Sequence, residues 1–240
     1  MNEQLKRAAA AGALEFVESG MKLGLGTGTT AEIFLELLGE KVRSGLTIIG
    51  AATSERTEAR ARSLGIACGT LDDLAPLDLD IDGADEADRI FNLIKGGGGA
   101  LLREKIVAAS SKRMIVIMDG SKLVDRLGRF PLPVEVTPFG HETSAARIRE
   151  AAAQGGFHDI PVTLRQRDGK AFITDSGNLI YDCAFGAIRD APALASLLGA
   201  VPGVVEHGLF VGLATTLIVA REAGLEVIGK QGRAAHVIQI

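Results

Sequence analysis

Residues that could do chemistry together are concentrated in one short stretch of the chain. Three carboxylates, Asp82, Asp85 and Glu86, precede Lys95, and four glycines follow this lysine directly at 96–99. A carboxylate can transfer protons, and a lysine beside backbone N–H groups can stabilise a developing negative charge. Successive glycines cost backbone entropy and add nothing to a core, so they are typical of backbone that lies against a ligand. The stretch therefore predicts a reaction centre.

Glu104 stands a little further on, in the first turn of a helix expected to begin near Ala100. Its spacing from Lys95 allows both side chains to face one pocket across the glycine turn. An exposed glutamate favoured by the helix dipole is the alternative for this position. For the upstream carboxylates, the alternatives are a solvated acidic loop and a site for a hard cation such as Mg²⁺. Lys95 and the glycines favour an organic anion over a cation.

A second glycine-rich loop, called the threonine loop below, follows the first expected strand. It reads Gly24-Leu25-Gly26-Thr27-Gly28-Thr29-Thr30. A dinucleotide fingerprint would place its third glycine where Thr29 stands, and it would need an acidic residue at the end of the second strand, which instead ends in alanine. No Gly-Lys-Ser/Thr sequence follows, so the loop is not of the ATP-binding type. The junction instead offers helix N–H groups and hydroxyls to a phosphate or carboxylate. A tight turn with threonine caps is the alternative.

Composition and charge narrow the class of protein. The 240 residues are 47% hydrophobic and 23% charged, which is enough apolar material for a core, and the net charge is −4. No stripe of lysine and arginine indicates a nucleic-acid surface. No signal peptide is visible, and the longest apolar run, 208–220, is too short to cross a bilayer. We expect a cytosolic protein in which this run forms a buried strand and helix.

The remaining reactive side chains give weaker signals. The two cysteines, Cys68 and Cys183, are far apart and are expected to be small core residues. Ser121-Lys122 follows a strand and is a weak sign of anion contact, whereas Lys6 is favoured as a surface lysine on the first helix. The histidines have no metal-like spacing and form no Ser-His-Asp set; they are His141, His158, His207 and His236.

Strand-like and helix-like segments alternate in the first half of the chain, which predicts a mostly parallel sheet with helices on both faces. The expected strands are 21–25, 46–51, 77–81 and 114–118. A first helix is expected over 2–19, with Gly20 as its C′ residue, and a second through Leu38. Thr53 or Ser54 should cap the next helix, which has an acidic residue in its first turn.

A change in composition near Arg126 predicts a small α+β unit. Its expected helices are 142–154 and 192–198, and its expected strands are 162–165, 171–174 and 179–183, with a hairpin turn at Asp168-Gly169. The sequence becomes apolar and rich in glycine again from Val204. We therefore expect one domain at 1–127 with 204–240 and a second at 128–203.

Several motifs occur together in one order. After the threonine loop come Asp82-Gly83-Ala84-Asp85-Glu86, Lys95-Gly96-Gly97-Gly98-Gly99-Ala100, Arg103-Glu104-Lys105, Thr174-Asp175-Ser176-Gly177-Asn178 and the run from Pro202 to Phe210. With these motifs in this order, nearly the whole sequence resembles ribose-5-phosphate isomerase, type A. The resemblance implies an α/β fold: a Rossmann-like, mostly parallel sheet with helices on both faces and a small inserted α+β (ferredoxin-like) domain. It also implies interconversion of D-ribose 5-phosphate and D-ribulose 5-phosphate in the non-oxidative pentose phosphate pathway.

The resemblance further implies no cofactor and no metal, a cytoplasmic location, and a homodimer or homotetramer without nucleic-acid or membrane partners. It assigns Glu104 as the catalytic base, with Asp82, Asp85 and Lys95 as further catalytic residues. Thr29 is a small departure, because many family members have serine there, but the hydroxyl is kept. The implied substrate contacts are Lys6, Thr27, Gly28, Thr29, Thr30, Gly83, Ala84, Gly96, Gly97, Gly98 and Lys122. The tail 229–240 matches no motif.

The chemistry of such a reaction explains the residue types. Moving a carbonyl between C1 and C2 requires one proton to leave one carbon and return to its neighbour, and a single carboxylate such as Glu104 can do both through an enediolate. Lys95 and the N–H groups of 96–98 would stabilise the enediolate oxygen, and Asp82 would assist opening of the sugar ring. Alternatives are an amino-sugar phosphate deaminase, a CoA transferase and a silent sugar-phosphate sensor.

Overall fold

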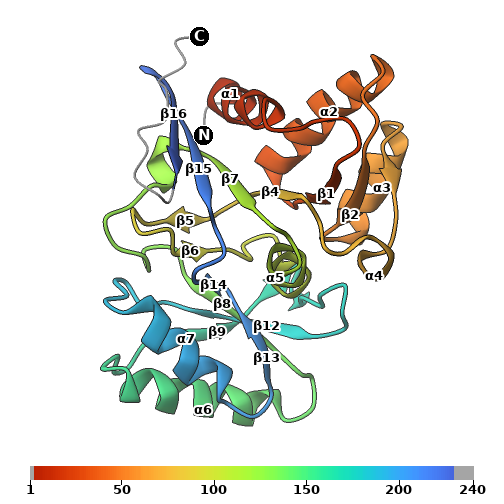
Figure 1. The fold of residues 1–240 in the computed structure, drawn as a ribbon. Helices are drawn as coiled ribbons and strands as arrows, with labels where there is room; N and C mark the ends of the chain where they lie inside the picture. Colours follow the sequence, from red (N-terminus) through yellow and green to blue (C-terminus); the bar gives the residue numbers. More distant parts are fainter. Residues whose placement is uncertain (1–2, 230–240) are drawn as a thin grey trace. The chain divides into compact units, whose positions relative to one another are not determined.

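The computed structural model describes residues 3–229, and these residues pack into two compact units (Figure 1). Among the described residues, unit 1 comprises 3–84, 103–123 and 212–229, and unit 2 comprises 85–102 and 124–211. The chain therefore passes between the units after residues 84, 102, 123 and 211. The domain boundaries expected from the sequence stay a prediction.

Unit 1 is built on a seven-stranded sheet in the order β16-β15-β7-β4-β1-β2-β3. All neighbouring strands are parallel except β15 and β16, which form an antiparallel pair at one edge. The strands are β1 (Lys22–Leu25), β2 (Ile49–Ala52), β3 (Ala67–Cys68), β4 (Leu79–Gly83), β7 (Met114–Asp119), β15 (Thr216–Arg221) and β16 (Gly224–Gly229).

Helices cover both faces of this sheet. Helices α1 (Glu3–Leu14) and α2 (Thr29–Arg43) pack on one face, where alternate strand residues such as Leu23 and Leu25 form a core with them. A smaller cluster includes Val107 of α5 (Leu101–Ala109) and Leu74 of α4 (Leu71–Leu74). Helix α3 (Glu55–Ser63) packs beside β2 and β3. Successive strand residues point to opposite faces of the sheet. Near-continuous apolar strands such as β7 therefore contribute side chains to the cores on both faces.

Unit 2 contains a four-stranded antiparallel sheet in the order β13-β8-β12-β9. The chain order of this sheet and its two helices is β-α-β-β-α-β, which is the ferredoxin-like arrangement. Its elements are β8 (Leu132–Val136), α6 (His141–Gln154), β9 (Val162–Leu164), β12 (Leu179–Cys183), α7 (Ala191–Gly199) and β13 (Val204–His207).

Two small sheets complete unit 2. Strands β5 (Glu86–Ala87), β6 (Leu93–Ile94) and β14 (Leu209–Phe210) form one, with β6 in the middle. Strands β10 (Gln166–Arg167) and β11 (Lys170–Ala171) form a hairpin, and its turn residues Asp168 and Gly169 both have positive φ, as the sequence Asp-Gly predicts. The expected α/β class, the mostly parallel sheet and the ferredoxin-like unit are confirmed.

Three local expectations are wrong. The apolar run 208–220 contains β14 and most of β15 but no helix, because a continuous apolar stretch cannot by itself distinguish a buried strand from a helix. The expected strand 171–174 is reduced to the short β11, whose pairing ends at Ala171. Helix α1 ends at Leu14, so Gly20, at φ 92°, lies in the turn before β1 rather than at the helix end.

Candidate active site

The carboxyl ends of four adjacent parallel strands carry most of the predicted site residues of unit 1. Strands β7, β4, β1 and β2 lie next to one another, and the strand order reverses between β4 and β1. In open α/β sheets, ligands bind outside the carboxyl ends of the strands at such a reversal. Asp82 bridges this point, because its Oδ1 accepts a hydrogen bond of 3.1 Å from the N–H of Thr27 on the neighbouring loop.

Asp82 is completely buried and closely packed against the threonine loop. Its Oδ1 also accepts from the N–H of Gly83 at 2.7 Å. A Cβ at position 26 would lie 2.2 Å from this oxygen and 2.6 Å from the Asp82 Cα. Real side chains do not tolerate such distances, so the approach of Asp82 to the loop requires Gly26.

Thr27 is held by a cluster of hydroxyl groups that the sequence did not reveal. Its Oγ1 lies 2.7 Å from the Oγ1 of Thr53, 2.8 Å from the Oγ of Ser54 and 2.9 Å from the Oγ1 of Thr57. Ser54 is also the N-cap of α3, where it accepts from the N–H of Thr57, as expected from the sequence. The Thr27 hydroxyl therefore fixes the loop to the start of α3.

The threonine loop leads into the N-terminus of α2, which the sequence predicts to bind an anion. Gly28 is its N-cap, with φ 125°, and no side-chain hydrogen bond caps this end among the described residues. Thr30 is buried, and the Thr29 Oγ1 accepts from the Lys6 Nζ at 2.7 Å. Lys6, expected from the sequence to lie on the surface, is thus brought to the first turn of α2. A cation and uncapped helix N–H groups suit a phosphate.

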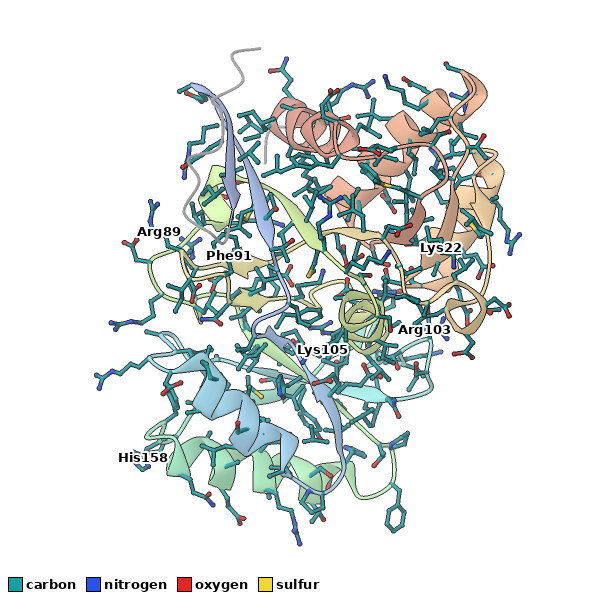
Figure 2. The ribbon with its side chains drawn as sticks, in the orientation of Figure 1. Lys22, Arg89, Phe91, Arg103, Lys105 and His158 are labelled. Carbon is teal, nitrogen blue, oxygen red and sulfur yellow. The ribbon has the colours of Figure 1, made fainter. Side chains whose placement is uncertain are left out.

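Glu104 is only 3% exposed, although it lies in the first turn of α5. The alternative of an exposed, dipole-stabilised glutamate is therefore wrong. Its neighbours Arg103 and Lys105 are labelled on the same helix in Figure 2, and Arg103 pairs with the exposed Glu55 at 3.5 Å. A glutamate is rarely buried to this degree without a partner or a function.

Lys122 ends a short turn that follows β7. Asp119 begins the turn η1 (Gly120–Lys122), where its Oδ1 accepts from the N–H of Ser121 at 2.9 Å. The Nζ of Lys122 donates to the carbonyl oxygen of Ala84, which directly follows β4. The lysine side chain is thus brought to the segment just after Asp82.

Unit 2 holds the remaining predicted residues, which include the buried Lys95. This lysine is 2% exposed, its backbone N–H donates to the carbonyl of Gly208, and its Nζ lies 5.5 Å from the centroid of the Phe210 ring. A buried ammonium group is costly unless compensated, and contact with an aromatic face supplies part of the compensation.

The backbone of residues 96–99, called the glycine bed below, is held by hydrogen bonds on two sides. The N–H of Gly97 donates to the Oδ2 of Asp85 at 2.8 Å. The carbonyls of Gly96 and Gly97 accept from the Nη1 of Arg165, at 2.8 and 3.3 Å. Sequence reasoning missed Arg165, because it lies 69 and 68 residues along the chain from Gly96 and Gly97 and no local pattern marks it.

Glu86, the third carboxylate of the acidic cluster, has a structural role. It is 1% exposed, and its carboxylate accepts from the N–H groups of Gly128 and Phe130 at 2.7 and 2.8 Å. This glutamate therefore anchors the 128–130 loop. Within residues 3–229, no group of three or more His, Cys, Asp or Glu side chains has a metal-binding arrangement. No helix within the same range is long and apolar enough to cross a membrane.

Comparisons with known proteins agree in one family. The family model described as ribose 5-phosphate isomerase A (phosphoriboisomerase A) matches residues 49–224. A ribose-5-phosphate isomerase A from Rhodopseudomonas palustris (strain BisB18) is 58% identical over 228 residues, covering 95% of this chain and 98% of the relative. Ribose 5-phosphate isomerase from Plasmodium falciparum has a solved structure with a TM-score of 0.90, 36% identity and coverage of 96% of this chain and 100% of that chain. A D-ribose-5-phosphate isomerase solved in complex with phospho-erythronic acid has a TM-score of 0.88 and 38% identity, covering 95% and 100%.

Proposed function

Since the chain belongs to the ribose-5-phosphate isomerase A family, we infer that it interconverts D-ribose 5-phosphate and D-ribulose 5-phosphate. The single observation that supports Glu104 as the base is its burial, at 3% exposure, in the first turn of α5. A buried carboxylate out of bulk water is suited to remove a proton from carbon and return it to the neighbouring carbon.

The other side chains divide the remaining work. Asp82 assists the opening and closing of the sugar ring. Lys95 stabilises the negative oxygen of the enediolate intermediate, because a buried ammonium acts strongly where water is excluded. The N-terminal turn of α2 and Lys122 bind the phosphate and so orient the reacting carbons.

The hydrogen bond from Gly97 to Asp85 refines the role of the glycine bed. This N–H is already engaged by a carboxylate, so the donors proposed for the enediolate are Lys95 and the N–H groups of Gly96 and Gly98. Asp85 then orders the bed. A relative has been solved in complex with phospho-erythronic acid, and the carboxylate of that compound resembles an enediolate at the end of a phosphorylated chain, which supports an enediolate intermediate.

An isomerase assay on the purified protein tests the reaction. With ribose 5-phosphate and EDTA, ribulose 5-phosphate should form at an enzymatic rate. Sugar-phosphate binding without turnover would favour a sensor, release of ammonia from an amino-sugar phosphate would favour a deaminase, and a glutamyl thioester would favour a CoA transferase. The cytosolic location, the homodimer or homotetramer and the absence of a cofactor stay predictions.

Replacement of Glu104 by Gln tests its role as the base. Glu104→Gln keeps the size of the side chain but cannot take up the proton, so kcat should fall by about 10² to 10⁴. Phospho-erythronic acid should still bind, as calorimetry can measure. Glu150→Gln on α6, an exposed position, is the matched control and should be as active as wild type. Near-normal turnover by Glu104→Gln would remove this residue from the role.

A further inference from the structure

Arg165 and Asp182 form an ion pair that the reaction described above does not use. The guanidinium donates from Nε to the Oδ2 of Asp182 at 2.9 Å and from Nη2 to the Oδ1. The two side chains are 13% and 28% exposed, so the pair is partly shielded from water. The third guanidinium nitrogen of Arg165, Nη1, points to the glycine bed, where it donates to the successive carbonyls of Gly96 and Gly97.

We propose that Arg165, oriented by Asp182, is a positioning residue that fixes the direction of the N–H groups in the glycine bed. The carbonyl of Gly96 and the N–H of Gly97 belong to one peptide plane. Arg165 holds its oxygen at 2.8 Å and Asp85 holds its N–H at 2.8 Å, so the plane is fixed at both ends.

The next peptide plane is the one that matters for the reaction. It joins the carbonyl of Gly97, which accepts from Arg165 at 3.3 Å, to the N–H of Gly98. In a trans peptide the N–H points opposite to the carbonyl, so fixing the oxygen on Arg165 directs the Gly98 N–H away from it. Without this contact a glycine-rich backbone has many conformations, and the donor would have to be ordered during the reaction.

The geometry explains why the residue is an arginine. A planar guanidinium can bind a carboxylate through two nitrogens and still present a third in a fixed direction, whereas a lysine ammonium has no such fork. Asp182 neutralises the charge of Arg165, so the pair orders the bed without adding a net charge to it.

The test compares Arg165→Lys and Asp182→Asn with wild type. Because it rests on the proposed isomerase function, it uses both turnover and ligand binding. In each variant, kcat for ribose 5-phosphate should fall by about 10 to 10²-fold, the scale expected from small misplacement of reacting groups. KM should change by less than about threefold, because the donor acts mainly on the transition state.

Two ligands of equal chain length separate positioning from general damage. Phospho-erythronic acid has a carboxylate where the enediolate oxygens would lie, and erythritol 4-phosphate lacks it. Arg165→Lys should weaken binding of the first by about tenfold or more, consistent with loss of a charge-directed hydrogen bond, and leave binding of the second within about twofold. Thermal melting shows whether each variant is folded.

Arg149→Lys is the matched control, because the Nη2 of Arg149 donates to the carbonyl of Val162, at the other end of β9, at 3.1 Å. It should behave as wild type. The proposal is overturned if Arg165→Lys matches this control, or if both ligands lose affinity equally together with a lower melting temperature, which indicates a structural role. If Arg165→Lys does not fold, Asp182→Asn decides by the same measurements. Failure of wild type to isomerise would overturn the proposed function instead.

Discussion

At the scale of single residues, buried charged groups serve different purposes in this protein. Lys95 and Glu104 are 2% and 3% exposed in the segments assigned to the reaction. Glu135 on β8 is equally buried, but its Oε1 accepts from the Thr174 hydroxyl and the Asn178 amide, both at 2.9 Å. It also receives a backbone hydrogen bond from Leu102 in α5. Burial alone therefore does not identify a catalytic group; Glu104 differs from Glu135 in standing in the motif Arg103-Glu104-Lys105, on which the family resemblance rests.

Glu135 gives a prediction about pH and stability. Burial raises the pKa of Glu135 above the ordinary 4.5, although its hydrogen bonds oppose the rise. The folded state therefore keeps its proton to higher pH than the unfolded state, and the free energy of unfolding should fall as pH rises from 4.5 through the raised pKa. In Glu135→Gln this contribution is absent, so the variant should gain stability relative to wild type over that interval.

Urea unfolding at several pH values from about 4 upward measures this difference, beginning below the ordinary pKa of a glutamate. Only the slope of the free energy of unfolding against pH is compared, because the altered hydrogen bonds of the variant add an offset to this free energy that does not depend on pH. Glu150→Gln, exposed on α6, should show no such slope relative to wild type. Equal slopes for wild type and Glu135→Gln would contradict the assignment.

At the scale of elements, the loop after β1 is fixed by close packing against β4. Gly26→Ala would place a Cβ 2.2 Å from the Asp82 carboxylate, so the loop or β4 must shift. We expect a loss of stability of about 1 to 3 kcal/mol, typical of overpacking, and a loss of activity because Asp82 moves. Gly199→Ala at the end of α7 meets no atom within 4 Å and should be neutral or slightly stabilising. Urea unfolding and kcat measure both, and wild-type stability in Gly26→Ala would contradict the steric argument.

The elements also show how far sequence alone can predict structure. Apolar runs bounded by glycine or acidic residues located β1, β4 and β7, and Ser54 located the start of α3, because these signals are local. The two-residue strands β5 and β6 were not expected, since they exist only through pairing with each other and with distant β14. The same holds for the site. Motifs marked the acidic cluster and the glycines, but not Arg165, because its contacts with the bed and with Asp182 form only in the fold.

At the scale of the whole molecule, neither unit is a continuous segment of the chain. The chain crosses between the units after residues 84, 102, 123 and 211, so the segment 85–102 of unit 2 has both ends in unit 1. Folding either unit fixes chain ends that belong to the other. We therefore expect one cooperative unfolding transition rather than two.

The single tyrosine allows a direct test. The chain has one tyrosine and no tryptophan, and Tyr181 lies on β12 of unit 2. Its fluorescence reports on unit 2 alone, whereas far-ultraviolet circular dichroism reports on both units. In urea the two transitions should coincide within error. A fluorescence midpoint clearly below or above the circular dichroism midpoint would show that the units unfold separately.

The close approach of Asp82 to Gly26 also limits how this sequence can diverge. A side chain can enter position 26 only if the group at 82 withdraws, and no amino acid has a carboxylate on a shorter stem than aspartate. A substitution at position 26 alone would clash with the Asp82 carboxylate, and a substitution at position 82 alone would remove that carboxylate. Substitution of both positions together would also remove the carboxylate. Among descendants that keep the acid, the glycine is inherited with it, so these two positions, 56 residues apart, are expected to behave as one heritable unit.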